Sequence, residues 1–262
     1  MTYSTLLFDV KDGIAHLTLN RPEALNSINL ELSKDLMQAV LECDEDPRIR
    51  AVVLSGNGRL FCAGGDLKTF TTQRERLPCY VKEVTTYLHA AVSRLTRMDP
   101  PVVAAVHGFA VGAGMSLALA CDLVIAAETA SFSVAYTRVG LTPDGSMSYF
   151  LPRLIGLKRA LELTLTNRTL SAQEALDWGL VTRVVPDGKL LSEANALAIQ
   201  LAAGPAKALG AAKRLMQKGS NETLETEMEN ETQTIAGIAR TSDTHEAIRA
   251  FIEKRAPKFT GN

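Results

Sequence analysis

The sequence predicts an α/β fold followed by a C-terminal part made of helices. Between residues 6 and 127, short runs of β-branched and aliphatic residues alternate with segments of helical periodicity. This alternation is typical of strands joined by right-handed helical crossovers. After about Leu157 nearly every segment has helical periodicity, and only 181–185 resembles a strand. With 262 residues, 46% of them hydrophobic, the chain can bury one large core.

Each predicted element has its own local signal. Strands at 6–10 and 14–19 flank Asp12-Gly13, the residue pair of a tight hairpin turn. Asn29 is a suitable N-cap for a helix over 30–43. Pro100-Pro101 ends a second helix. Strands are further predicted at 51–55, 102–106 and 123–127, and helices at 81–98, 114–120, 158–166, 171–178, 189–203, 205–217, 222–240 and 243–255.

The chain is expected to have two parts. Residues 1–194 would form the core with the functional site, and residues 195–262 a helical subdomain. Gly204-Pro205 and Gly219-Ser220 separate amphipathic helices in this second part that are too short to be stable alone. Helices of this kind often pack on a neighbouring subunit, so self-association is expected.

Charge and composition exclude several classes of function. With 28 basic and 29 acidic residues, the chain has no overall field that would attract nucleic acid or an anionic membrane. The apolar stretch 101–127 is interrupted by His107 and Asp122, so it is expected to be core and not a membrane span. The N-terminus has no export or transit pattern, which predicts a cytoplasmic protein.

The four cysteines are expected to be buried free thiols, without a metal site. They show no C-x-x-C pair and no zinc-ligand spacing. The nucleophile elbow, the phosphate-binding loop and the H-E-x-x-H metal motif are also missing from the sequence. The cysteines are Cys43, Cys62, Cys79 and Cys121.

Two glycine-rich segments are candidates for binding a ligand through the backbone. Residues 55–67 follow a buried strand, and Gly64-Gly65 leaves a backbone N–H unobstructed by side chains. Residues 108–115 precede a helix of small residues, whose N-terminal N–H groups are suited to an oxyanion. A loop without function explains the first segment equally well, and close packing of helix on strand explains the second. The wall of any pocket is expected to include a loop at 69–78.

Asp144 and His89 are the candidate side chains. Asp144 lies between a proline and a glycine, so a turn or a helix cap is the alternative to a catalytic role. His89 lies at the border of the apolar stripe of its helix, where histidines are usually structural. Tyr136 is expected to be a core aromatic.

Five short motifs follow one another along the chain. They are LNRPEALN at 19–26, FCAGGDL at 61–67, G-x-x-x-G-x-G at 108–114, ACD at 120–122 and KRAPKF at 254–259. Together they make the sequence similar to the crotonase superfamily, the enoyl-CoA hydratases and isomerases, over nearly its whole length. The resemblance implies a spiral of ββα repeats, and C-terminal helices that build a homotrimer or a dimer of trimers. It also implies an acyl-CoA substrate, so coenzyme A is part of the substrate and no separate cofactor is expected.

The resemblance implies roles for backbone groups in both glycine-rich segments. The amides of Ala63 and Ala113 would form an oxyanion hole for the thioester oxygen. Such donors stabilise an enolate more than the ground state, and each is worth roughly 3–4 kcal/mol. Coenzyme A would lie along Ala24, Ala63, Gly64, Asp66 and Leu67, with Lys258 and Phe259 contacting it from the C-terminus.

The chain departs from the hydratases at their two catalytic glutamates, which are replaced by Ser116 and Tyr136. Asp144 instead matches the single aspartate of two other branches. In the ring-epoxide isomerases of phenylacetyl-CoA breakdown it would move a proton, and this is the leading hypothesis. In the 4-chlorobenzoyl-CoA dehalogenases it would be a nucleophile, with His89 activating water. A hydratase, or a CoA- or RNA-binding member without catalysis, are the further alternatives.

Overall fold

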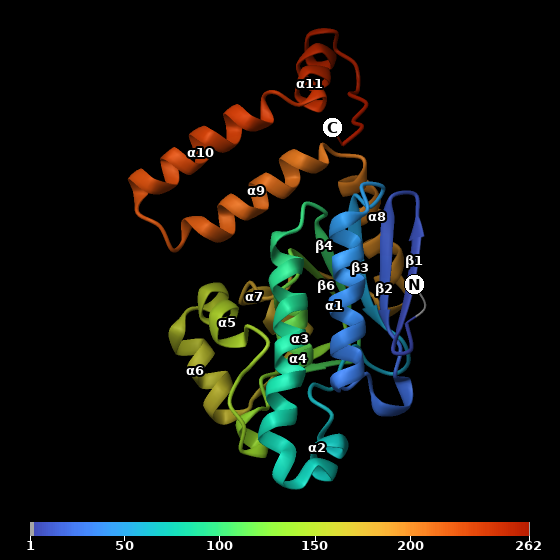
Figure 1. The fold of residues 1–262 in the computed structure, drawn as a ribbon, viewed down its shortest axis with the longest axis vertical. Helices are drawn as coiled ribbons and strands as arrows, with labels where there is room; N and C mark the ends of the chain where they lie inside the picture. Colours follow the sequence, from blue (N-terminus) through green and yellow to red (C-terminus); the bar gives the residue numbers. More distant parts are fainter. Residues whose placement is uncertain (1–2, 262) are drawn as a thin grey trace.

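The computed structural model describes residues 3–261 and confirms the α/β spiral (Figure 1). A six-stranded sheet of order β1-β2-β3-β4-β6-β9 forms its centre, and only the β1–β2 hairpin is antiparallel. A smaller sheet has the order β5-β7-β8. The strands are β1 (Leu6–Lys11), β2 (Ile14–Leu19), β3 (Ala51–Gly56), β4 (Val102–Val106), β5 (Phe109–Val111), β6 (Leu123–Ala127), β7 (Ser131–Ser133), β8 (Thr169–Ser171) and β9 (Arg183–Val185).

Helices cover the large sheet, because its central strands are apolar on both faces and need cover on each. Helix α1 packs against α3, and α8 packs against β3, β4 and β6. The helices are α1 (Leu30–Glu45), α2 (Leu67–Gln73), α3 (Leu77–Arg97), α4 (Ala113–Leu119), α5 (Met147–Ile155), α6 (Leu157–Thr166), α7 (Ala172–Asp177), α8 (Leu190–Ala202), α9 (Ala206–Gly219), α10 (Leu224–Ile238) and α11 (Ser242–Ile252).

The parallel strands bring the predicted motifs to one edge of the sheet. The chain leaves the carboxyl ends of β2, β3 and β4 through 20–29, 57–66 and 107–112. Carboxyl edges of parallel sheets are where α/β proteins bind their ligands. The segments 25–28 and 62–66 also pair directly, through a parallel bridge between Ile28 and Gly65. The fold therefore assembles three separate motifs into one place.

Asn26 fixes the first of these segments. It is fully buried with a left-handed φ of 54°, a conformation that asparagine tolerates better than most residues. Its side-chain amide donates to the carbonyl groups of Asn57, Leu60 and Phe61 at 2.8, 3.0 and 3.1 Å. Its Oδ1 accepts from the Arg21 amide at 2.9 Å. One side chain thus satisfies backbone groups of both loops.

The C-terminal helices extend from one end of the core, opposite α2 (Figure 1). Helix α9 is fixed to the core by Lys213, whose ammonium group donates to Asp122 at 3.0 Å and to the carbonyl groups of Leu95 and Pro100 at 3.1 Å. Both partners of the ion pair are largely buried. Burial raises the pKa of Asp122, while Lys213 and the Val102 amide act in the opposite direction.

Beyond α9, apolar side chains remain exposed. No residue of α10 is buried. Exposed apolar patches of this kind mark protein contacts. They are a physical reason to expect self-association, which remains a prediction. The most exposed large apolar side chains of α10 and α11 are Leu224, Ile235, Phe251 and Ile252.

Four expectations from the sequence need correction. The boundary predicted at residue 195 falls inside α8, which packs on the large sheet. The separate C-terminal helices therefore begin after Ala202, where α8 ends. The loop expected at 69–78 is largely helical, since Asp66 caps α2. Cys79 is exposed, because it lies on the outer side of the first turn of α3. Strands β5, β7 and β8 were missed, since three residues carry no period-2 signal.

Within residues 3–261, no helix combines the length and apolar character needed to span a bilayer.

Replacing Asn26 by alanine removes the shared donor of three carbonyl groups and the residue type that tolerates φ of 54°. We expect the free energy of unfolding to fall by about 2–3 kcal/mol, measured by urea denaturation. Asn57→Ala is the matched control, because its side chain bonds only Asn20 at the surface and should change stability by less than about 0.5 kcal/mol. Equal effects of the two substitutions would contradict the proposed role of Asn26.

Candidate active site

Two backbone segments meet where the glycine-rich motifs were predicted to bind a ligand. Cys62 pairs with β5: its amide donates to the Phe109 carbonyl at 3.1 Å, and its carbonyl accepts from Val111 at 3.0 Å. Gly64 has φ of 90°, and a Cβ there would lie 2.7 Å from the Val111 oxygen and 3.6 Å from the Ala113 nitrogen. Only glycine lets the first segment approach the start of α4 this closely.

The first predicted oxyanion donor needs correction. The Ala63 amide donates to the Leu25 carbonyl at 3.1 Å, so it is not available to a ligand. The neighbouring Gly65 amide has no acceptor among the described residues. Bonds on either side hold it in place: Ile28 donates to the Gly64 carbonyl at 2.7 Å, and Asp66 donates to the Ile28 carbonyl at 3.0 Å. Gly65 is therefore the better candidate for the first donor.

Ala113, the second predicted oxyanion donor, is the first residue of α4. Amides in the first turn of a helix have no partner within the helix. The helix dipole adds a partial positive charge at this end. The preceding Gly112 takes φ of 53°, and its amide donates to the Ser133 carbonyl of β7 at 2.9 Å. The smaller sheet thus fixes the direction from which α4 begins.

Asp144 is half-buried and held by two hydroxyl groups. The Tyr136 hydroxyl donates to Oδ1 of Asp144 at 2.6 Å. The Ser116 hydroxyl donates to the Asp144 carbonyl at 2.9 Å and also lies 3.0 Å from the Tyr136 oxygen. Ser116 and Tyr136 are the residues at the positions of the hydratase glutamates. Here they hold Asp144, whose carboxyl Oδ2 has no donor among the described residues.

The environment shifts both titrating groups of this cluster. Burial raises the pKa of Asp144, and the Tyr136 hydrogen bond and a nearby His89 only partly oppose this. Burial and then the Asp144 charge raise the pKa of Tyr136 far above its usual range, so the phenol remains a hydrogen-bond donor at neutral pH. A carboxyl group with a raised pKa is a better base than a free aspartate.

A strained turn separates Asp144 from α5. Gly145 and Ser146 both have positive φ, of 58° and 79°. A Cβ on Gly145 would lie 3.0 Å from the Cβ of Ser116, so this position requires glycine for its space as well as its φ. Its amide donates to Nε2 of His89 at 3.1 Å. Glycine adopts such a φ without strain, whereas Ser146 is strained, and strained residues are frequent at functional sites.

A cavity of about 860 Å³ lies beside Asp144. Its size is in the usual range of small-molecule sites. Helices α3, α5 and α9 form its walls, and His89 and Asp144 both line it. The oxyanion candidates lie outside its lining. Ser116 lies between them and Asp144: its hydroxyl is 2.9 Å from the Asp144 carbonyl and 3.3 Å from the Gly112 carbonyl. The cavity thus brings His89 and Asp144 together, and Ser116 links Asp144 to α4.

The residues expected to contact coenzyme A are differently exposed. Leu67 is exposed, and Ala24 is half-exposed. Gly64 and Asp66 are buried, and the Asp66 carboxylate bonds Arg21 and the Thr69 amide. A contact from Asp66 to a ligand is therefore limited to its main chain.

Lys258 and Phe259 lie away from the other predicted coenzyme A contacts. The Phe259 carbonyl accepts from Arg50 at 3.1 Å, just before the amino end of β3. The loop to Gly65 leaves the carboxyl end of that strand, about 20 Å away. Figure 1 likewise shows the C-terminus far from α2, which begins at Leu67. Within one chain, the two residues are therefore separated from the other predicted contacts.

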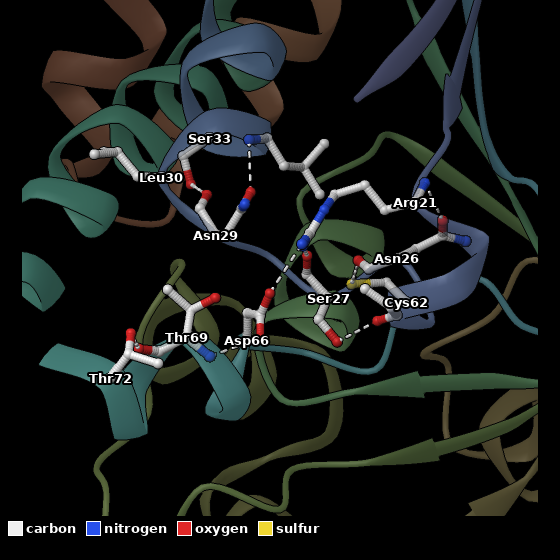
Figure 2. Close-up of polar contacts among 12 residues, drawn as sticks. Arg21, Asn26, Ser27, Asn29, Leu30, Ser33, Cys62, Asp66, Thr69 and Thr72 are labelled. Atoms are coloured by element: carbon white, nitrogen blue, oxygen red, sulfur yellow. Dashed lines mark hydrogen bonds and ion pairs between the residues drawn. The ribbon is translucent and has the colours of Figure 1, made fainter. Parts of the chain in front are cut away.

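Arg21 belongs to the LNRPEALN motif, whose sequence predicts no role for its side chain. Figure 2 shows its guanidinium group between Asp66 and the backbone of Ser27. Neither this pairing nor the free Gly65 amide can be predicted from local patterns, because both depend on the contact between 25–28 and 62–66. In the described part of the chain, no three metal-binding side chains are grouped together.

Comparison with known proteins places this geometry in a family. The family model for enoyl-CoA hydratase/isomerase matches residues 9–262. The 1,2-epoxyphenylacetyl-CoA isomerase of Escherichia coli K12 is 40% identical over 259 residues, 98% of each chain. The 4-chlorobenzoyl coenzyme A dehalogenase-2 of an Arthrobacter species is 37% identical over 239 residues, 91% of this chain and 86% of the relative. The crystal structure of an enoyl-CoA hydratase from Polaromonas sp. JS666 superposes with a TM-score of 0.93 at 36% identity, covering 97% and 99% of the two chains.

The chain belongs to the enoyl-CoA hydratase/isomerase family and is an acyl-CoA enzyme of the crotonase fold. This confirms the resemblance and the fold predicted from the five motifs. Relatives named for isomerisation and for dehalogenation have similar identities, so the particular reaction has to be argued from the site.

Replacing Tyr136 by phenylalanine removes the hydrogen bond that lowers the pKa of Asp144. We expect that pKa, already raised by burial, to rise further, because the ionised form loses its donor. Carbon-13 NMR titration of labelled aspartate carboxyl groups measures it directly. Tyr87→Phe, at a position away from Asp144, should leave the Asp144 titration unchanged. An unchanged or lower pKa in Tyr136→Phe would mean that the bond does not stabilise the carboxylate.

Proposed function

We propose that the chain is an enoyl-CoA isomerase of the epoxyphenylacetyl-CoA isomerase type, with Asp144 as its acid and base. Oδ2 of Asp144 would remove a proton from the carbon next to the thioester carbonyl. The electron pair of that C–H bond would form an enolate conjugated with the neighbouring double bond. The same carboxyl group would return the proton two carbons further along, which leaves the double bond conjugated with the carbonyl.

The amides of Gly65 and Ala113 would stabilise the enolate. The thioester oxygen gains negative charge only as the proton leaves, so donors aimed at it lower the barrier more than they strengthen ground-state binding. Removing one donor of this kind typically costs about 10²–10³ in kcat. The gap between the two segments is suited to this role, because Gly64 allows them to approach one another.

The state of Asp144 is the observation that supports isomerisation most directly. One carboxylate oxygen is fixed by Tyr136, and the other has no donor among the described residues and belongs to a group that lines the cavity. One base with a raised pKa is sufficient to shuttle a proton between two carbons. Addition of water with two carboxylates is not supported, because hydroxyl groups occupy both corresponding positions.

A dehalogenase is the second candidate, favoured by the Arthrobacter relative and by His89 in the cavity wall. In that reaction Asp144 would attack the aromatic ring and expel chloride, and His89 would activate water to hydrolyse the aryl ester. However, Nε2 of His89 accepts the Gly145 amide. That nitrogen cannot take a proton from water while the bond persists, which makes this candidate weaker.

Asp144→Asn tests both candidates, because asparagine keeps the acceptor for Tyr136 but cannot take up a proton. We expect conversion of a 3-enoyl-CoA into its conjugated 2-enoyl isomer, followed by ultraviolet absorbance, to fall by about 10²–10⁴-fold. Asp177→Asn is a matched control, since Asp177 bonds only Gln173 at the surface. Turnover in Asp144→Asn equal to that of the wild type would overturn the proposal.

Incubation with 4-chlorobenzoyl-CoA separates the two roles of Asp144. For an isomerase we expect no chloride release and no added mass on the peptide that contains Asp144. An aryl ester trapped on that peptide, detected by mass spectrometry, together with no turnover of 3-enoyl-CoA, would replace the first candidate by the second.

A further inference from the structure

A largely buried ion pair lies next to the oxyanion loop without lining the cavity. Nη2 of Arg21 is 3.0 Å from Oδ2 of Asp66, and the two side chains are 15% and 8% exposed. Removing one partner of a buried pair leaves the other charge without compensation. The pair also lies outside the reacting groups of the proposed function, so it requires its own explanation.

Each partner makes a second contact to a different segment (Figure 2). Nη1 of Arg21 donates to the Ser27 carbonyl, and Oδ1 of Asp66 accepts from the Thr69 amide at 3.1 Å, which caps α2. The pair thus joins the exit from β2, the 25–28 segment and the start of α2. Burial acts to raise the pKa of Asp66, but bonds from Thr69 and Arg21 outweigh it and lower that pKa, so Asp66 is charged at neutral pH.

The Gly65 amide lies between these fixed points. Asp66 follows it directly, and Ile28, next to the Ser27 carbonyl that Arg21 holds, bonds the backbone on both sides of Gly65. A rotation of the peptide between Gly64 and Gly65 would have to break one of these bonds or move Asp66. The direction of the free N–H is therefore coupled to the ion pair, although both charged groups are engaged by protein atoms and neither lines the cavity.

We propose that the Arg21–Asp66 ion pair is a positioning device that aims the Gly65 amide at the thioester oxygen. The inference rests on the proposed function, because it assumes an acyl-CoA thioester in the gap between Gly65 and Ala113. Arg21 and Asp66 are positioning residues, since they act only through the backbone of the loop. A displacement of about 1 Å in such a group can cost about 10²-fold in rate.

Asp66→Asn separates positioning from general stabilisation. Asparagine is as good an N-cap as aspartate, so the bond from the Thr69 amide can persist while the ion pair is lost. We expect kcat for a 3-enoyl-CoA to fall about 10–100-fold, with KM changed less than about threefold. The direction of the Gly65 N–H affects stabilisation of the transition state more than binding of the substrate. Arg21→Lys keeps the positive charge but cannot bond both Asp66 and the Ser27 carbonyl through two guanidinium nitrogens. We expect a smaller loss of kcat in this variant.

A spectroscopic measurement reports on the donor itself. Hexanoyl-CoA carrying carbon-13 at the thioester carbonyl binds without reacting, and its infrared stretching frequency falls when N–H donors polarise the carbonyl. We expect a lowered frequency in the wild type and a return toward the solution value in Asp66→Asn. Glu193→Gln, which removes the exposed ion pair with Arg183, should leave both the frequency and kcat unchanged.

The outcomes separate this inference from the proposed function. A carbonyl shift that is lost in Asp66→Asn supports positioning even if no isomerase activity is found. An unchanged shift in Asp66→Asn, or a wild-type protein that binds the thioester without any shift, overturns the inference while isomerase activity can still stand. If Asp66→Asn does not fold, the same two readouts on Arg21→Lys decide, and unchanged values there also overturn it.

Discussion

The site depends on backbone N–H groups that remain unpaired although the protein surrounds them. An unsatisfied amide costs free energy in a folded protein, so a loop left to itself would rotate the group toward a carbonyl or water. Around Gly65, hydrogen bonds to Ile28 on both sides prevent that rotation. At Ala113, the same condition arises from the start of a helix, where the first amides have no partner. The free energy that keeps these groups unpaired comes from bonds made elsewhere in the fold.

The position of Asp144 and its pKa are set by different parts of its surroundings. Tyr136 and Ser116 use their hydroxyl groups to hold the side chain and the main chain of Asp144. Burial raises the pKa of Asp144, and the tyrosine bond limits that rise. The hydroxyl groups therefore direct the one carboxylate and keep it ionisable.

Much of the fold could be predicted from the sequence, because the central elements have strong local signals. The hairpin turn at Asp12-Gly13 and the N-cap Asn29 correspond to observed boundaries. The three-residue strands could not be predicted, because they exist only as partners of one another. In the site, two residues could be found from local sequence patterns. Asp144 is an acid between a proline and a glycine, and Ala113 lies in a glycine-rich segment before a helix. That the Gly65 amide is free and the Ala63 amide is not depends on the pairing of 62–66 with 25–28. The helical form of 69–76 depends on the cap that Asp66 provides. Neither contact can be read from the local sequence.

The attachment of α9 has a consequence for the cavity beside Asp144. Lys213 fixes one face of α9 to the core, and other residues of the same helix, Arg214 and Lys218 among them, form a wall of the cavity beside Asp144. Helix α9 also packs against α10, whose apolar side chains are uncovered. Helix α10 therefore packs directly on the helix that forms one wall of the cavity. The position of α9 thus links the exposed face of α10 to the shape of the cavity beside Asp144.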